Sequence, residues 1–71
     1  MRNDKLHWYH FCLAWQVSSG ATYKDVSCGF CNQKVTSSRM LFAKQNAGAP
    51  KDAMITSISY LGCMTREEFE G

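Results

Sequence analysis

Residues 27 to 32, Ser-Cys-Gly-Phe-Cys-Asn, contain two thiols separated by a two-residue spacer. In a tight Cys-x-x-Cys turn both sulfurs point at one centre, and Gly29 avoids the crowding that a Cβ would add there. Such a turn suits Zn²⁺ or a thiol redox pair. A structural zinc needs four protein ligands, so half of its site must come from elsewhere in the chain.

Cys12 and Cys63 are the other two cysteines of the chain. We therefore predict one structural Zn²⁺ in a Cys₄ site, with the ligands Cys12, Cys28, Cys31 and Cys63. His10 is a substitute ligand for Cys63, because His10 and Cys12 point the same way if they lie on one strand.

The stretch around Cys28 also fits an ordinary half-buried strand. Apolar side chains alternate with polar or small ones from residue 25 to residue 30. If the chain runs extended through Cys31, Cys28 and Cys31 face opposite sides of a sheet, and each packs as a small hydrophobe. The local sequence leaves both interpretations open.

The chain length of 71 residues allows one small domain, residues 1–71. So small a core benefits from a zinc ion, a disulfide or a dimer partner. The first ten residues are too polar for the apolar part of a cleavable signal, and no apolar run reaches membrane-spanning length. We therefore expect a cytoplasmic protein with no membrane partner, in a compartment that favours metal-bound or free thiols over disulfides.

The charged residues are few and scattered. Eight Lys and Arg against six Asp and Glu leave a net charge of +2, with no basic cluster in the linear sequence. A dedicated nucleic-acid binder usually gathers basic residues on one face, so nucleic acid is not the favoured partner. The apolar fraction of 45% indicates a folded domain rather than a disordered chain.

A long strand is predicted over residues 5–17, which are rich in aromatic and apolar side chains and contain no Gly or Pro. One face of this strand is more apolar and is the predicted core face: Tyr9, Phe11, Leu13, Trp15 and Val17. The other face, with Trp8, His10 and Cys12, is expected to be half wet. Ser18-Ser19-Gly20 predicts a turn into a second, antiparallel strand over residues 22–28.

The middle of the chain predicts one helix, from about Ser37 to Ala47. Thr36 is a suitable N-cap residue, and Gly48 is the expected left-handed stop. Pro50 prevents the helix from continuing.

The last third of the chain predicts a strand over residues 53–61, which alternate polar and β-branched or aromatic side chains and end at Gly62. Thr65 and Glu68 then have the spacing of a capping box for a short helical turn that carries Phe69.

These elements predict an α+β fold: a small, mainly antiparallel three-stranded sheet in the order β-β-α-β, with one helix packed on one face. The side chains expected to be buried are Phe11, Leu13, Trp15, Met40, Leu41 and Ile58.

Exposed aromatic side chains are the main candidates for partner binding. Trp8, Tyr23 and Tyr60 could anchor another protein, because interface anchors are enriched in Trp and Tyr. A homodimer through a strand edge or through this aromatic face is a second expectation. No paired carboxylates, phosphate-binding Gly loop or metalloprotease motif is present, so we do not expect an enzyme.

The second half of the chain resembles a known group of proteins. Lys34-Val35-Thr36-x-Ser38, then Met40, Ala47-Gly48 and the strand from Ile55 to Tyr60, are similar to the very small proteins of lambdoid prophages of enteric bacteria, some of which are described as zinc-binding. The resemblance implies a phage-derived accessory protein and no catalytic activity. The Cys28-x-x-Cys31 pair is not part of that pattern, so no ligand is transferred from it.

Three functions follow from these observations. The first is a non-enzymatic accessory protein that binds another protein through its sheet. The second is a zinc-ribbon-like nucleic-acid-binding protein, and the third is a Cys-x-x-Cys thiol redox protein.

Overall fold

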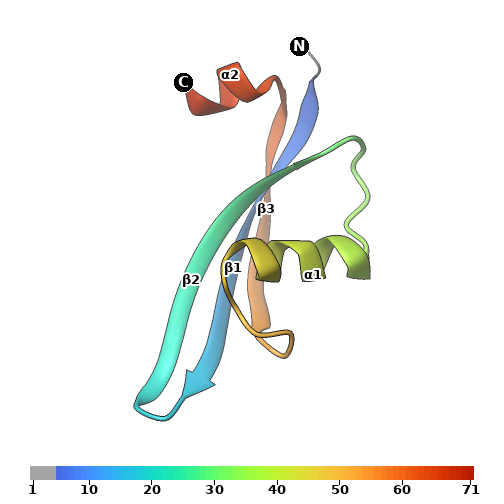
Figure 1. The fold of residues 1–71 in the computed structure, drawn as a ribbon. Helices are drawn as coiled ribbons and strands as arrows, with labels where there is room; N and C mark the ends of the chain where they lie inside the picture. The colour runs from blue at the N-terminus through green and yellow to red at the C-terminus, as the bar shows by residue number, and fades with distance from the viewer. Residues whose placement is uncertain (1–4) are drawn as a thin grey trace.

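The computed structural model describes residues 5–71 (Figure 1). Its elements in chain order are β1 (Leu6–Val17), β2 (Gly20–Phe30), α1 (Ser37–Asn46), β3 (Met54–Met64) and α2 (Arg66–Glu70). The three strands form one antiparallel sheet with the order β2-β1-β3. This confirms the predicted sheet, with β1 as the central strand.

The two strand pairings differ in length. β1 pairs with β2 from His7 opposite Phe30 to Val17 opposite Gly20, with a two-residue turn between them. β1 pairs with β3 only as far as Ala14 opposite Met54. The tip of the β1–β2 hairpin therefore extends beyond β3 as a two-stranded ribbon (Figure 1).

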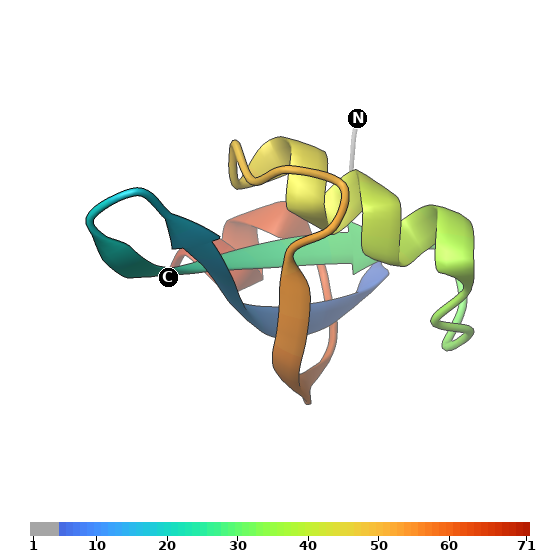
Figure 2. The ribbon, with the colours of Figure 1, turned by 90° about the horizontal axis from the view of Figure 1, so that it is seen from below.

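β3 continues beyond Gly62, where the sequence predicted its end. It does so because Gly62, at φ +123°, adopts a backbone conformation that other residues rarely take. The pairing with β1 slips twice, so that Thr56 and Leu61 have no partner residue. Figure 2 shows the strong twist of the sheet, with β3 crossing β2 at a steep angle.

Side chains of neighbouring strands share two faces. The first we call the Phe11 face; its members from the strands include Tyr9, Phe11, Leu13, Lys24, Val26, Cys28, Phe30, Ile55, Ile58 and Tyr60. The second we call the His10 face, and it carries Trp8, His10, Cys12, Tyr23, Asp25 and Ser27. The main buried cluster lies on the Phe11 face and includes Ala43 of α1.

The predicted core is right in part. Phe11 and Leu13 are fully buried. Trp15, Met40 and Leu41 are only half-buried. Ile58 was predicted to be buried and is 41% exposed, because it lies on the outermost strand β3.

The ends of α1 follow local rules. The Thr36 hydroxyl accepts a hydrogen bond from the Arg39 amide, as predicted for an N-cap. At the other end the Gly48 amide donates to the Gln45 carbonyl and the Ala49 amide donates to the Lys44 carbonyl. Gly48 has φ +74°, so this is a Schellman stop at the predicted glycine.

α2 begins with the predicted capping box. The Glu68 amide donates to the Thr65 hydroxyl, and the Thr65 amide donates to the Glu68 carboxylate at 2.9 Å. Within residues 5–71, neither helix is long and apolar enough to cross a membrane.

Candidate functional site

Cys28 lies within β2 rather than in a turn. It is opposite Tyr9 on the Phe11 face and is almost completely buried. Its sulfur accepts a weak hydrogen bond from the Asn46 side chain at 3.9 Å. Burial raises the pKa of the Cys28 thiol because the thiolate is poorly solvated there, and the Asn46 hydrogen bond offsets part of that rise.

The other three thiols lie in different places. Cys12 is half-buried on the His10 face, opposite Asp25. Cys31 is exposed just after the end of β2, and Cys63 is exposed on β3, opposite His7.

In this arrangement the four thiols do not fit one zinc ion. Zinc lies about 2.3 Å from each thiolate sulfur, so all four must converge. Cys12 and Cys28 instead point to opposite faces of the sheet, because β2 runs extended through Phe30. Residues 5–71 contain no group of three or more His, Cys, Asp or Glu side chains placed to hold a metal. The Cys₄ site, with His10 as a substitute ligand, stays a prediction that would require a different path for β2.

Gly29 has a role other than relieving a metal-binding turn. A Cβ at this position would lie 3.0 Å from Leu6 Cδ1 and 3.0 Å from two ring atoms of Trp8. The missing side chain therefore lets the Trp8 indole lie directly against β2.

Trp8 is buried, although the sequence predicted an exposed aromatic side chain at this position. It is only 2% exposed. Phe69 of α2 stacks on its ring, and its indole N–H donates to the Met64 carbonyl at 2.9 Å. The sequence predicted a partly exposed face because the packing of α2 on β1 depends on a contact between Trp8 and Phe69, which lie far apart in the chain.

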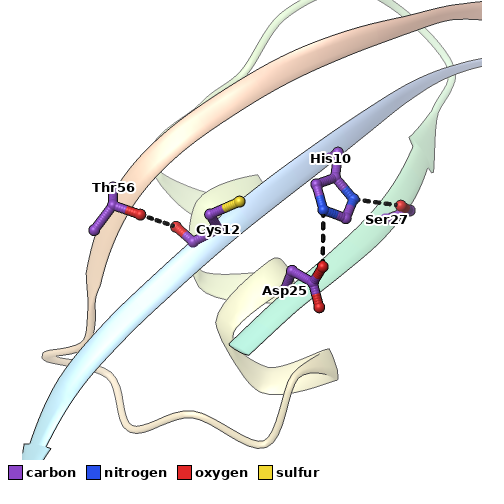
Figure 3. A network of polar contacts seen from close by, with 5 residues as sticks. All are labelled: His10, Cys12, Asp25, Ser27 and Thr56. Carbon is purple, nitrogen blue, oxygen red and sulfur yellow. Dashed lines mark hydrogen bonds and ion pairs between the residues drawn. The ribbon is translucent and has the colours of Figure 1, made fainter. Parts of the chain in front are cut away.

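Figure 3 shows a polar network on the His10 face. His10 bridges two residues of β2: Nδ1 lies 2.9 Å from the Ser27 hydroxyl, and Nε2 lies 3.1 Å from the Asp25 carboxylate. Thr56 of β3 donates to the Cys12 carbonyl at 3.1 Å, which ties the edge strand to the centre.

This network was not predicted from the sequence, although the pairing rule of the hairpin places its residues opposite one another. A turn at residues 18 and 19 places His10 opposite Ser27 and Cys12 opposite Asp25. A carboxylate only accepts hydrogen bonds, so the His10 Nε2 carries the proton toward Asp25. These hydrogen bonds can fix the orientation of the His10, Asp25 and Ser27 side chains, and they form a polar surface on the His10 face.

Arg39 organises the segment after β2. Its guanidinium donates to the Asn32 side chain at 2.6 Å and to the Lys34 carbonyl at 2.7 Å. It also donates to the Cys31 sulfur at 3.5 Å and lies over the Phe30 ring. The contact between Arg39 and Cys31 spans eight positions, so it is not visible in the linear sequence.

Tyr23 is the most exposed large hydrophobic side chain of residues 5–71, with 75% of its surface accessible. It lines two neighbouring shallow hollows of about 280 and 220 Å³. Their other lining residues are Cys12, Leu13, Ala14, Trp15, Gln16, Ala21, Lys24, Asp25, Met54 and Thr56. This surface combines an aromatic anchor with apolar walls and a few charges.

Tyr60 lies on β3, away from Tyr23. It is 47% exposed, and its hydroxyl forms a hydrogen bond with His7 Nδ1 at 2.9 Å. Its ring packs against Tyr9, with 5.1 Å between the centroids. The three aromatic residues predicted for partner binding therefore lie in three different settings.

Comparison of the chain with protein-family models, with curated proteins and with solved structures finds no match.

Proposed function

We propose that this is a non-enzymatic accessory protein that binds another protein through the His10 face, with Tyr23 as the anchor. The observation that carries the proposal is the 75% exposure of Tyr23 between two adjacent hollows. Tyrosine is enriched among residues that dominate interface energies, because its ring buries much area while its hydroxyl keeps a hydrogen bond.

The surroundings of Tyr23 support an interface. Met54, which lines one of the hollows, is 66% exposed, and methionine adapts its shape to a partner surface. Asp25, on the same face as Tyr23, lines the other hollow and supplies a negative charge. Such a surface fits a partner with an apolar centre and a polar rim.

The position of α1 supports an interface on the His10 face of the sheet. We propose that α1, which contributes the buried Ala43 to the cluster, serves as the cover of the Phe11 face. The part of the His10 face around Tyr23 is then the surface left for a partner. The resemblance to small prophage proteins makes a phage-derived role in the host cytoplasm our working proposal for its origin.

Site-specific photo-crosslinking tests this function in cells that express the protein. A photoreactive phenylalanine analogue is placed at position 23, and at Lys51 as a control, because Lys51 is exposed in the turn before β3. We expect one discrete adduct from position 23 that is absent from position 51. The purified partner identified in it should bind the chain directly, and Met54→Asp should weaken that binding.

Absence of any protein adduct at position 23 would contradict the proposal. An adduct of twice the mass of the chain would identify a self-contact at this face instead. Binding to random DNA or RNA that weakens steeply with salt would favour the nucleic-acid alternative, since phosphate contacts release counterions.

One observation favours the thiol redox function as a second candidate. The guanidinium of Arg39 donates to the sulfur of the exposed Cys31, three positions after Cys28. Reduction of an insulin-type disulfide by the reduced protein, abolished by Cys31→Ser, would support it. Activity that survives Cys31→Ser would reject this site.

A further inference from the structure

The outer edge of β3 is unprotected. No residue of β3 is charged and none is proline. Seven large hydrophobic residues of the described part of the chain are exposed, and four of them lie on this strand: Met54, Ile58, Tyr60 and Leu61. Within residues 5–71 no further strand pairs with this edge, because β3 is last in the sheet order.

The opposite edge of the sheet differs. β2 carries Lys24 and Asp25 near its middle, both exposed. Soluble proteins place charges or proline on edge strands to prevent pairing with other chains. β2 has such protection and β3 does not, apart from the two irregularities at Thr56 and Leu61.

We propose that two copies of the chain pair through the β3 edges, antiparallel and about a two-fold axis at Ser59, to form a continuous six-stranded sheet. A second copy is the occupant for a physical reason. An uncharged strand meets no repulsion from itself, and an isologous contact needs no other surface to be complementary. The edge supplies main-chain hydrogen bonds, and the exposed side chains supply apolar contact.

The register follows from strand geometry. In an antiparallel pair, the side chains of directly opposite residues lie on the same face of the sheet. A two-fold axis between two copies of β3 must therefore set one residue opposite the same residue of the second copy. The regular part of β3 between its irregularities is Ser57 to Tyr60. An axis at Ser59 sets Ile58 opposite Tyr60 of the second copy, twice. An axis at Ser59 sets Ser57 opposite the irregular Leu61, and an axis at Ile58 would set Tyr60 opposite the irregular Thr56, so the irregularities do not separate the two registers. We choose Ser59 because it pairs the two large exposed side chains Ile58 and Tyr60 with each other.

This inference does not depend on the proposed function. Tyr23 lies on β2, which is separated from β3 by the central strand. Met54 and Thr56 of β3 line the hollows beside Tyr23, but they lie outside the Ser57–Tyr60 segment on which the dimer is centred, so the dimer leaves Tyr23 to a different partner. Each proposal is therefore tested by its own residue.

Sedimentation equilibrium of the full chain at micromolar concentration tests the dimer. We expect twice the mass of the chain for the native protein. Ile58→Lys should raise the dimer dissociation constant by about tenfold or more, because two aromatic–β-branched pairs are lost and two charges enter the edge. The matched variant Tyr23→Lys, which places the same charge on the other edge strand, should leave the constant unchanged.

A second measurement covers the case in which Ile58→Lys fails to fold. Ser59→Cys, in a chain whose Cys12, Cys31 and Cys63 are replaced by serine, should form an intermolecular disulfide on mild oxidation, since opposite Cβ atoms are close enough to bridge. Cysteine at position 22 on β2 should not. A native protein that stays monomeric, or a dimer lost with Tyr23→Lys and not with Ile58→Lys, would overturn the proposal.

Discussion

The rings of Trp8 and Phe69 stack almost parallel, with 4.1 Å between their centroids and 6° between their planes. This contact connects β1 to α2 across most of the chain length. Gly29 of β2 also lies close to the Trp8 ring, and the Arg66 guanidinium lies 5.3 Å from the ring centroid. The short helix α2 therefore covers a small second core on the His10 face.

Phe69→Ala should remove the ring that covers Trp8 and expose the Trp8 indole. We expect a loss of about 2 kcal/mol of unfolding free energy, since a half-buried phenylalanine and an aromatic pair are both lost. In a Trp15→Phe background the fluorescence of Trp8 should shift to longer wavelength. Glu70→Ala on the same helix removes only the exposed ion pair with Arg66 and should cost less than about 0.5 kcal/mol.

Gly29→Ala should destabilise the protein through contact with Trp8. The added Cβ would lie 3.0 Å from the indole, so the ring must move away from β2. We expect about 1 to 3 kcal/mol of lost stability in urea unfolding, as for overpacked cores. In a Trp8→Leu background the same substitution should cost much less. An equal cost in both backgrounds would show that the ring is not the cause.

Tyr9→Phe should loosen the segment that follows β2. The Tyr9 hydroxyl donates to the Gln33 carbonyl at 3.0 Å from a nearly buried ring. We expect a loss of about 1 kcal/mol and faster amide exchange at residues 32–36. Tyr23→Phe removes the same atom from an exposed ring and should change stability by less than about 0.5 kcal/mol. Equal effects of the two substitutions would contradict this assignment.

Stability should fall at alkaline pH because of Cys28. Burial raises its pKa above the ordinary value of 9.0, so the folded protein holds this proton more tightly than the unfolded chain. The contribution is complete below the unfolded pKa and is lost as the pH rises through the folded pKa. Unfolding free energy should therefore fall more steeply in the native protein than in Cys28→Ala as the pH rises past the ordinary thiol pKa of 9.0. Equal slopes would refute the role of Cys28.

Native mass spectrometry of protein purified without added metal tests the zinc hypothesis. Because Cys12 and Cys28 lie on opposite faces, we expect no bound ion and four titratable thiols, with Cys28 the slowest to react. One zinc per chain, lost only in acid or with a strong chelator, would instead support the Cys₄ site. It would also mean that β2 does not run extended through Cys28.

The sequence by itself determined the elements and the ends of the helices. Caps are local, so Thr36, Gly48 and the Thr65–Glu68 capping box could be identified from a few neighbouring residues. The strands and the hairpin turn followed from alternation and from Ser18-Ser19-Gly20 in the same way. The antiparallel sheet was then a short step, because strands joined by a tight turn pair with each other.

Only the tertiary structure decided the environment of the chemically interesting side chains. Whether Cys28 lies in a turn or in a strand depends on pairing with β1, and the burial of Trp8 depends on the return of α2. Ile58 alternates like a core residue, yet it is exposed because β3 took the outer position in the sheet. Strand order and helix docking depend on contacts between residues that are far apart in the chain. A local pattern of residues does not indicate the energies of such contacts.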